Sequence, residues 1–142
     1  MSEPEERADS VPTREEVAGW LERYESAWRA PGTEAVRALF SDDATYQLAP
    51  YDERIRGINE IAAMWERERE RPDEPFTMTS DTVAVDGDTA VVRVEVHYAG
   101  PPAREYRDLW VLELEDDGRC RAFEEWPFWP EQPRYAPGGT RG

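Results

Sequence analysis

The chain has 142 residues, the usual length of one domain, and 39% of them are hydrophobic while 35% are charged. Its formal net charge is −15, from 32 acidic residues against 17 basic ones, and every basic residue is Arg. An excess of this size repels phosphate backbones and anionic lipid, so we expect neither a nucleic acid nor a membrane as partner. The apolar residues are grouped and periodic, which excludes disorder of the whole chain.

The rare residue types exclude further classes. Cys120 is the single Cys and can form neither an internal disulfide nor a thiolate metal cluster, and the single His, His97, excludes a His-rich metal site. The acidic N-terminal sequence lacks the apolar run of a signal peptide, and no stretch approaches the ~18 apolar residues of a membrane span. We therefore expect a cytoplasmic protein that uses no metal and no cofactor.

The first half of the chain predicts helices. Residues 1–12 are expected to form a disordered lead, residues 13–130 the folded domain and residues 131–142 a flexible tail. Thr13 begins a helix, and Glu16 completes a capping box. Its apolar face, at helical spacing, comprises Val17, Trp20, Leu21, Tyr24, Ala27 and Trp28. This helix ends at Pro31-Gly32, and Thr33 is expected to cap a short second helix.

A short strand is predicted at 44–48, followed by a polar loop at 50–57 that we expect to form a solvated lid over a pocket mouth. A third helix is predicted over about 58–69, and Pro72 closes it. Four strands follow at 76–85, 89–98, 104–115 and 119–129, separated by Gly-containing turns. Helices first and strands later predict an α+β fold with an antiparallel sheet.

Strand alternation singles out Asp108. The even positions of the strand at 104–115 carry Tyr106, Asp108, Trp110, Leu112 and Leu114, so Asp108 is the one acid on an apolar and aromatic face. A buried carboxylate is costly unless it is hydrogen-bonded, or else it keeps its proton. Asp108 is therefore either a structural residue, bonded to a backbone amide or to Arg, or a functional residue of a pocket.

The element order, the run Phe40-Ser41-Asp42-Asp43-Ala44-Thr45 and a helix that opens at Gly57-Ile58 resemble the nuclear transport factor 2-like superfamily, which includes SnoaL-like and ketosteroid isomerase-like domains. The resemblance covers about residues 13–129. It implies a cone-shaped curved antiparallel β-sheet with three N-terminal helices enclosing a pocket, and a homodimer formed through the outer face of the sheet. The superfamily includes isomerases, cyclases, dehydratases, epoxide hydrolases and non-catalytic modules, so the fold alone does not give the activity.

Three enzyme branches can be compared with the sequence. In ketosteroid isomerase a Tyr on the first helix and a protonated Asp on a late strand form the oxyanion hole. Tyr24 and Asp108 stand at the matching places, so the resemblance implies that both donate to one ligand oxygen. The place of that enzyme's general base holds Leu48, which argues against steroid isomerisation.

The other two branches fit less well. SnoaL-like cyclases carry an acid/base Asp shortly after a Trp in the last strand, but Trp126 is followed by Pro127, Phe128, Trp129 and Pro130. Limonene epoxide hydrolase has an Arg two residues before its Asp, where this chain has Tyr106. Glu124 and Glu125 offer a substitute base, since one of them faces inward unless a bulge changes the phase. The alternative is a solvated pair near the rim.

Aromatic residues are abundant, with six Trp and six Tyr. The residues expected to face the cone interior, besides Tyr24 and Asp108, are Trp20, Trp28, Tyr46, Leu48, Trp65, Tyr106, Trp110, Trp126 and Phe128. They either line a pocket for an apolar or aromatic small molecule or fill the cone themselves. The sequence thus favours a small-molecule pocket protein. It is either a cofactor-independent acid–base enzyme of isomerase, cyclase or dehydratase type or a non-catalytic ligand-binding module.

Overall fold

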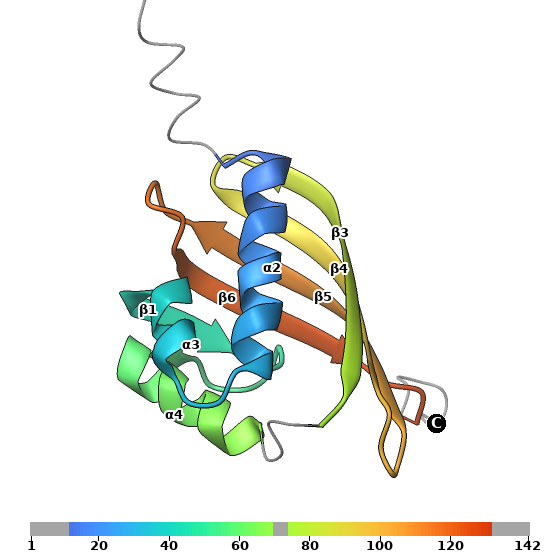
Figure 1. The fold of residues 1–142 in the computed structure, drawn as a ribbon. Coiled ribbons are helices and arrows are strands. Elements are labelled where there is room, and N and C mark those ends of the chain that lie inside the picture. The colour runs from blue at the N-terminus through green and yellow to red at the C-terminus, as the bar shows by residue number, and fades with distance from the viewer. Residues whose placement is uncertain (1–11, 70–73, 132–142) are drawn as a thin grey trace, which may run out of the picture.

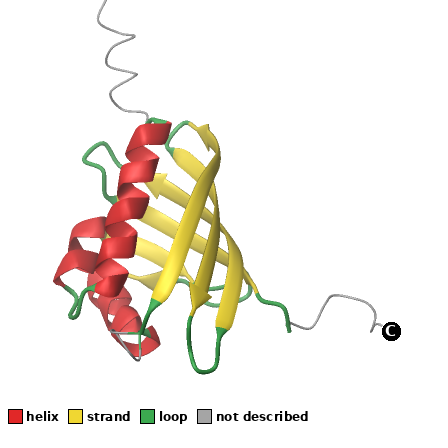
Figure 2. Cartoon of the chain, turned by 45° about the vertical axis from the view of Figure 1, so that its right-hand side comes forward, coloured by secondary structure: helices red, strands yellow, loops and turns green. Residues whose placement is uncertain are grey.

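The structure, a computed structural model, describes residues 12–69 and 74–131. Within these ranges three helices lie on one side of a curved six-stranded sheet (Figures 1 and 2). The arrangement is the α+β cone that the sequence predicted. Most of the expected lead at 1–12 and tail at 131–142 lies outside the described residues.

Helix α2 (Arg14–Arg29) begins at the predicted capping box. The Glu16 backbone N–H donates to the Thr13 hydroxyl over 3.1 Å, and the Thr13 backbone N–H donates to the Glu16 carboxylate over 2.9 Å. The helix buries Val17, Trp20, Leu21, Tyr24 and Ala27 against the sheet and its neighbours. The apolar stripe read from the sequence is therefore the face that closes the cone.

The other two helices are shorter. Helix α3 (Glu34–Leu39) follows Thr33, but the predicted cap is wrong because the Thr33 side chain makes no capping hydrogen bond. The backbone of Thr33 has ψ 5°, whereas an N-cap residue is typically extended. Helix α4 (Ile58–Glu68) buries Ile61, Ala62, Met64 and Trp65. Both helices pack beside strand β1, away from the long strands of the sheet (Figure 1).

The sheet contains the strands β1 (Phe40–Gln47), β2 (Ile55–Arg56), β3 (Phe76–Asp86), β4 (Thr89–Tyr98), β5 (Arg104–Leu114) and β6 (Cys120–Phe128). Their order is β2-β1-β6-β5-β4-β3. Strands β1 and β6 run parallel and the other neighbours antiparallel, so the sheet is mixed where the sequence predicted an antiparallel one. The reason is that β6 pairs with β1, which precedes it by more than 70 residues, a contact that no local pattern records.

The register of β4 and β5 confirms the predicted faces. Val94 lies opposite Asp108, and Val92 lies opposite Trp110. Val92 and Val94 are fully buried, while Arg93 between them is exposed. Asp108 and Trp110 therefore point from β5 toward the helices.

Strand β6 contains a bulge that reverses its alternation. Cys120 pairs with Leu114 and Ala122 with Glu113, which leaves Arg121 as an extra residue. As a result both Cys120 and Phe123 are buried, although they are three positions apart. After the bulge the odd positions of β6 face inward.

None of the helices in the described ranges is long and apolar enough to cross a membrane.

The capping box gives a stability prediction with an internal control. We expect Thr13→Ala to lower the free energy of unfolding by about 1 kcal/mol, because it removes the acceptor for the Glu16 amide. Thr33→Ala removes a Thr before a helix that has no side-chain cap, so its cost should stay below about 0.5 kcal/mol. Urea unfolding of both variants measures the difference, and equal losses would contradict the cap assignment.

Candidate functional site

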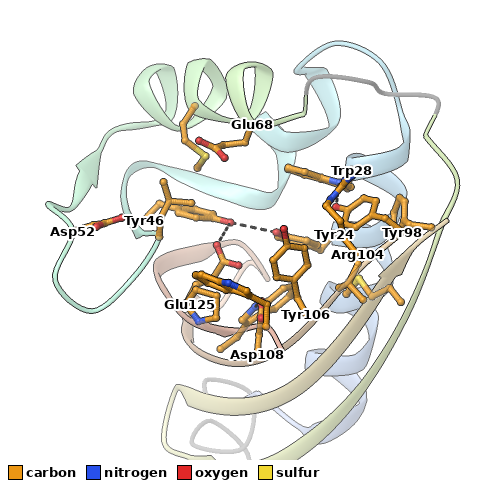
Figure 3. Close-up of a pocket in the computed structure, with 18 residues that line it drawn as sticks. Tyr24, Trp28, Tyr46, Asp52, Glu68, Tyr98, Arg104, Tyr106, Asp108 and Glu125 are labelled. Carbon is orange, nitrogen blue, oxygen red and sulfur yellow. Dashed lines mark hydrogen bonds between the residues drawn. The ribbon is translucent and has the colours of Figure 1, made fainter. Parts of the chain in front are cut away.

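A cavity of about 450 Å³ lies between α2, α4 and the inner face of the sheet (Figure 3). Its volume is in the range of small-molecule sites. The lining residues are Tyr24, Trp28, Tyr46, Leu48, Asp52, Met64, Glu68, Phe76, Met78, Val96, Tyr98, Arg104, Tyr106, Asp108, Trp110, Glu125, Pro127 and Trp129. The aromatic side chains thus leave a space inside the cone rather than filling it.

Hydroxyl and carboxyl groups from three elements meet at one end of this cavity. The Tyr24 hydroxyl, from α2, lies 3.3 Å from the Tyr46 hydroxyl, from β1. The Tyr46 hydroxyl donates to Glu125 Oε1, from β6, over 3.3 Å. Because Tyr46 uses its proton on Glu125, Tyr24 is the donor to Tyr46. The dashed lines of Figure 3 follow this chain.

Asp108 stands next to Glu125 on the neighbouring strand. The residue is only 7% exposed, and its Oδ2 accepts from Trp110 Nε1 over 3.1 Å. Its other oxygen, Oδ1, is shielded from solvent and has no close hydrogen-bond partner in the described residues, although Asp108 also interacts with the Glu125 carboxyl and the Phe128 backbone amide. The two carboxyl groups lie within hydrogen-bonding reach of one another, so a proton on one of them can be donated to the other.

Burial controls the protonation of this pair. It raises the pKa of Glu125 well above its ordinary value of 4.5, and the adjacent charge of Asp108 raises it further. Burial also raises the pKa of Asp108, although the hydrogen bonds with Trp110 and Glu125 partly offset the effect. The pair therefore retains one proton to a higher pH than two separate carboxyls would, and Glu125 is its main carrier.

The two tyrosines are neutral donors. Burial raises the pKa of both Tyr24 and Tyr46 well above 10.0, and the charge of Glu125 adds to this. Neither hydroxyl can therefore serve as a base near neutral pH. They can donate hydrogen bonds to charge that develops on a carboxyl or on a ligand oxygen.

The rim of the cavity has its own charges. Arg104 donates to Glu74 over 3.1 Å, and its guanidinium lies 4.5 Å from the centre of the Tyr98 ring. Glu68, near the end of α4, and Asp52, in the loop after β1, lie at other parts of the rim (Figure 3). Within the described residues, no group of three or more His, Cys, Asp or Glu side chains is placed to hold a metal ion.

Several residues assigned to the pocket from sequence lie elsewhere. Trp20 and Trp65 are fully buried and do not line the cavity. Their rings contact the Tyr24 ring at 5.6 and 5.0 Å between centres. Because Tyr24 itself lines the cavity, these two Trp residues form the core layer behind the wall.

The sequence-based assignment to the cavity was also wrong for Trp126, Phe128 and Glu124. The bulge in β6 is the cause, because it reverses which side chains face inward. Trp126 and Phe128 lie on the outer face with 40% and 45% of their surface exposed. Glu124 accepts from Trp126 Nε1 over 2.6 Å on that face. Of the two candidate bases only Glu125 faces the cavity.

Sequence reasoning also left out several lining residues, among them Val96, Tyr98, Arg104, Pro127 and Trp129. A signal existed for the first three, since Val96 and Tyr98 share the even face of β4 and Arg104 shares that of β5. Pro127 and Trp129 stand at odd positions, like Glu125. Alternation counted from the start of β6 does not assign these positions to the inner face, because the bulge shifts it by one residue. Asp52 belongs to the loop expected at the pocket mouth.

The hydroxyl chain yields a second stability prediction. We expect Tyr46→Phe to cost about 1–3 kcal/mol of unfolding free energy, because it leaves both the Tyr24 hydroxyl and Glu125 without their partner. Tyr24→Phe keeps the bond between Tyr46 and Glu125, so it should cost less, about 1 kcal/mol. Denaturant unfolding compares the two variants, and an equal or larger loss for Tyr24→Phe would contradict the order of the chain.

The raised pKa of Glu125 predicts a pH effect. The folded protein retains this proton at pH values where the unfolded chain has released it, so unfolding free energy falls as the pH rises from 4.5 through the raised pKa. Glu125→Gln removes that dependence. Its stability relative to wild type is therefore expected to increase across this window, as measured by urea unfolding at a series of pH values.

Glu124→Gln is the matched control, because it removes the same kind of carboxylate one residue away on the outer face. Identical pH profiles for Glu124→Gln and Glu125→Gln would contradict the prediction.

Comparison with solved structures shows the fold. A de novo designed protein with a curved β-sheet has a TM-score of 0.61 and 19% sequence identity, covering 81% of this chain and 87% of that one. A LEH-like epoxide hydrolase from M. tuberculosis has a TM-score of 0.61 and 20% identity, covering 82% and 86%. A sequence comparison with curated proteins gives no match.

The family follows from the sequence itself. Residues 21–123, well over half of the chain, match the SnoaL-like domain. The matched range begins on α2 and ends on β6, so it includes Tyr24, Tyr46 and Asp108 of the cavity. The chain is therefore a member of the SnoaL-like domain family.

Proposed function

We propose that this SnoaL-like domain is a cofactor-independent acid–base enzyme that moves protons on an apolar, ring-bearing small molecule, as an isomerase, cyclase or dehydratase does. One observation carries the proposal. Two carboxyl groups, that of the buried Asp108 and that of the partly buried Glu125, lie within hydrogen-bonding reach of each other at one end of an aromatic cavity. Paired acids whose surroundings push their pKa values apart supply one proton donor and one proton acceptor.

The roles follow from the contacts. Glu125 carries the proton and receives a hydrogen bond from Tyr46, so it acts as the general acid. The pKa of Asp108 is raised less than that of Glu125, so Asp108 is the ionised partner and acts as the base. Tyr24 reaches only Tyr46 and is a positioning residue. This assignment differs from the sequence-based hypothesis, in which Tyr24 and Asp108 donate to the same ligand oxygen.

The aromatic wall supports the choice of substrate class. Trp28, Tyr106 and Trp110 surround the cavity with flat apolar surface, while the hydroxyl and carboxyl groups of the acid pair and its two tyrosines are gathered at one end and the other charged groups stand at the rim. This division is typical of sites that hold a ring by burial and orient it with a few hydrogen bonds.

Proton exchange at carbon tests catalysis directly. We expect wild-type protein to accelerate exchange of the α-protons of 2-tetralone, a bicyclic ketone, in D₂O, followed by NMR. Asp108→Asn should lower the rate about 10²- to 10⁴-fold, the usual contribution of a general base. Glu124→Gln on the outer face is the control and should retain the rate. Unchanged exchange in Asp108→Asn would remove Asp108 from the mechanism.

A second candidate is a non-catalytic ligand-binding module. Leu48 favours it, because this residue lines the cavity at the place where the resembling isomerase carries its base. Quenching of Trp fluorescence by 2-tetralone without any proton exchange would identify this alternative.

The homodimer and the cytoplasmic location stay predictions. The expected interface is the outer face of the sheet, where Leu109 and Trp126 are paired neighbours and both exposed. Sedimentation of the purified protein would measure the oligomeric state.

A further inference from the structure

Two further tyrosines line the cavity away from the acid pair. Tyr98, the last residue of β4, and Tyr106, on β5, are both partly buried, and their rings meet edge to face with centres 6.2 Å apart. Tyr106 lies two residues before Asp108 on β5, and Tyr98 lies opposite Arg104. Tyr106 and Tyr98 therefore stand roughly 7 and 13 Å along the strands from the row of Asp108. In Figure 3 Tyr98 and Arg104 lie on the opposite side of the view from Glu125, so the cavity has a second polar point.

Each of these hydroxyls accepts a hydrogen bond from a neighbouring nitrogen, so its own proton remains to be donated. The Trp28 indole Nε1 donates to the Tyr98 hydroxyl over 3.2 Å. The Arg104 guanidinium donates to the Tyr106 hydroxyl and also lies over the Tyr98 ring. A hydroxyl that accepts one hydrogen bond becomes a stronger donor of another. No hydrogen bond within the described residues takes either proton, so an oxygen of the ligand is the acceptor that suits both.

The surroundings of the two hydroxyls select a neutral oxygen. An ammonium group has no lone pair to accept the two protons on offer. An anion is disfavoured because the described lining residues include four acids, Asp52, Glu68, Asp108 and Glu125. The guanidinium of Arg104 offsets little of this charge, since it is paired with Glu74 over 3.1 Å. A carbonyl oxygen is neutral and a good acceptor, so it fits this end of the cavity.

We propose that Tyr98 and Tyr106 form a subsite for a neutral carbonyl oxygen, and that the substrate carries such an oxygen at the end of its ring body remote from the reacting carbon. The inference rests on the proposed function for the place of the reacting carbon, beside Asp108 and Glu125. It adds that the substrate is oxygenated at both ends. Neither hydroxyl touches the reacting atoms, so its loss weakens binding and does not slow proton transfer.

Two ketones of nearly the same shape test the subsite. 6-Acetyl-2-tetralone carries a second carbonyl oxygen at the far end of its bicyclic body, and 6-isopropyl-2-tetralone has a methyl group in place of that oxygen. We expect wild-type protein to bind the acetyl compound roughly 3- to 10-fold more tightly, the range for one hydrogen bond between neutral groups. Quenching of Trp fluorescence measures both affinities. Equal affinity, or no binding of the acetyl compound, would overturn the proposal.

Removal of the two hydroxyls should remove the preference. Tyr98→Phe and Tyr106→Phe each delete one donor and keep the ring, and the double variant should bind both ketones with the affinity that wild type has for the isopropyl compound. Tyr51→Phe is the matched control, because Tyr51 is fully exposed and does not line the cavity, so the preference should remain. A preference that survives in the double variant, or that falls equally in Tyr51→Phe, would contradict the subsite.

A single variant covers the case in which the double variant does not fold. Tyr106→Phe leaves the hydrogen bond between Trp28 and Tyr98 in place, so it disturbs the packing least. We expect it to reduce the preference for the acetyl compound while the affinity for the isopropyl compound stays the same. An unchanged preference, or an equal loss of affinity for both ketones, would overturn the proposal.

Exchange kinetics separate this inference from the proposed function. For exchange of the ring α-protons of the acetyl compound in D₂O, Tyr106→Phe should raise KM and leave kcat unchanged, and a fall in kcat at constant KM would contradict the subsite. Asp108→Asn should lose the exchange yet keep the preference in binding. A wild-type preference without exchange would remove the catalysis and leave the subsite, whereas exchange without a preference would remove the subsite and leave the catalysis.

Discussion

The placement of two carboxyl groups side by side, in the buried Asp108 and the partly buried Glu125, is the constraint on which the site depends. Strand register fixes it, since Trp110 lies opposite Glu125 and Asp108 opposite Pro127 on adjacent strands. Withdrawing carboxyl groups from water is costly, and the Trp110 indole, the Tyr46 hydroxyl, the Phe128 backbone amide and a shared proton reduce that cost. Such a pair is a poor way to stabilise a core, and its cost is explained if the pair acts on a ligand.

The side chains that meet at the acid pair come from different parts of the chain. Tyr24 belongs to the first helix described, Tyr46 to the strand beside β6, and Glu125 to the last strand. The mixed sheet brings them together, because the parallel pairing of β1 with β6 places Tyr46 next to Phe123 and close to Glu125. Loss of the β1–β6 pairing would therefore separate the hydroxyl from its acid, which makes the site a property of the assembled sheet.

The chemistry of this protein depends on the residues of its cavity and not on its fold. Two solved structures with the same TM-score of 0.61 are a designed protein and an epoxide hydrolase, so the fold alone does not decide the chemistry. Within this cavity position 48 is Leu, and β6 contributes the carboxyl group of Glu125.

Local patterns in the sequence determined the capping box of α2, the bounds of the four long strands to within one residue, and the inward direction of Asp108. Helix capping and strand alternation depend on residues only a few positions apart. The parallel β1–β6 pairing and the choice between Glu124 and Glu125 were decided only by the tertiary structure. The extra residue at Arg121 reverses the alternation of β6, so Trp126 and Phe128 face outward although Cys120, of the same parity, is buried. A bulge is defined by the partner strand, and the residues of one strand alone do not specify it.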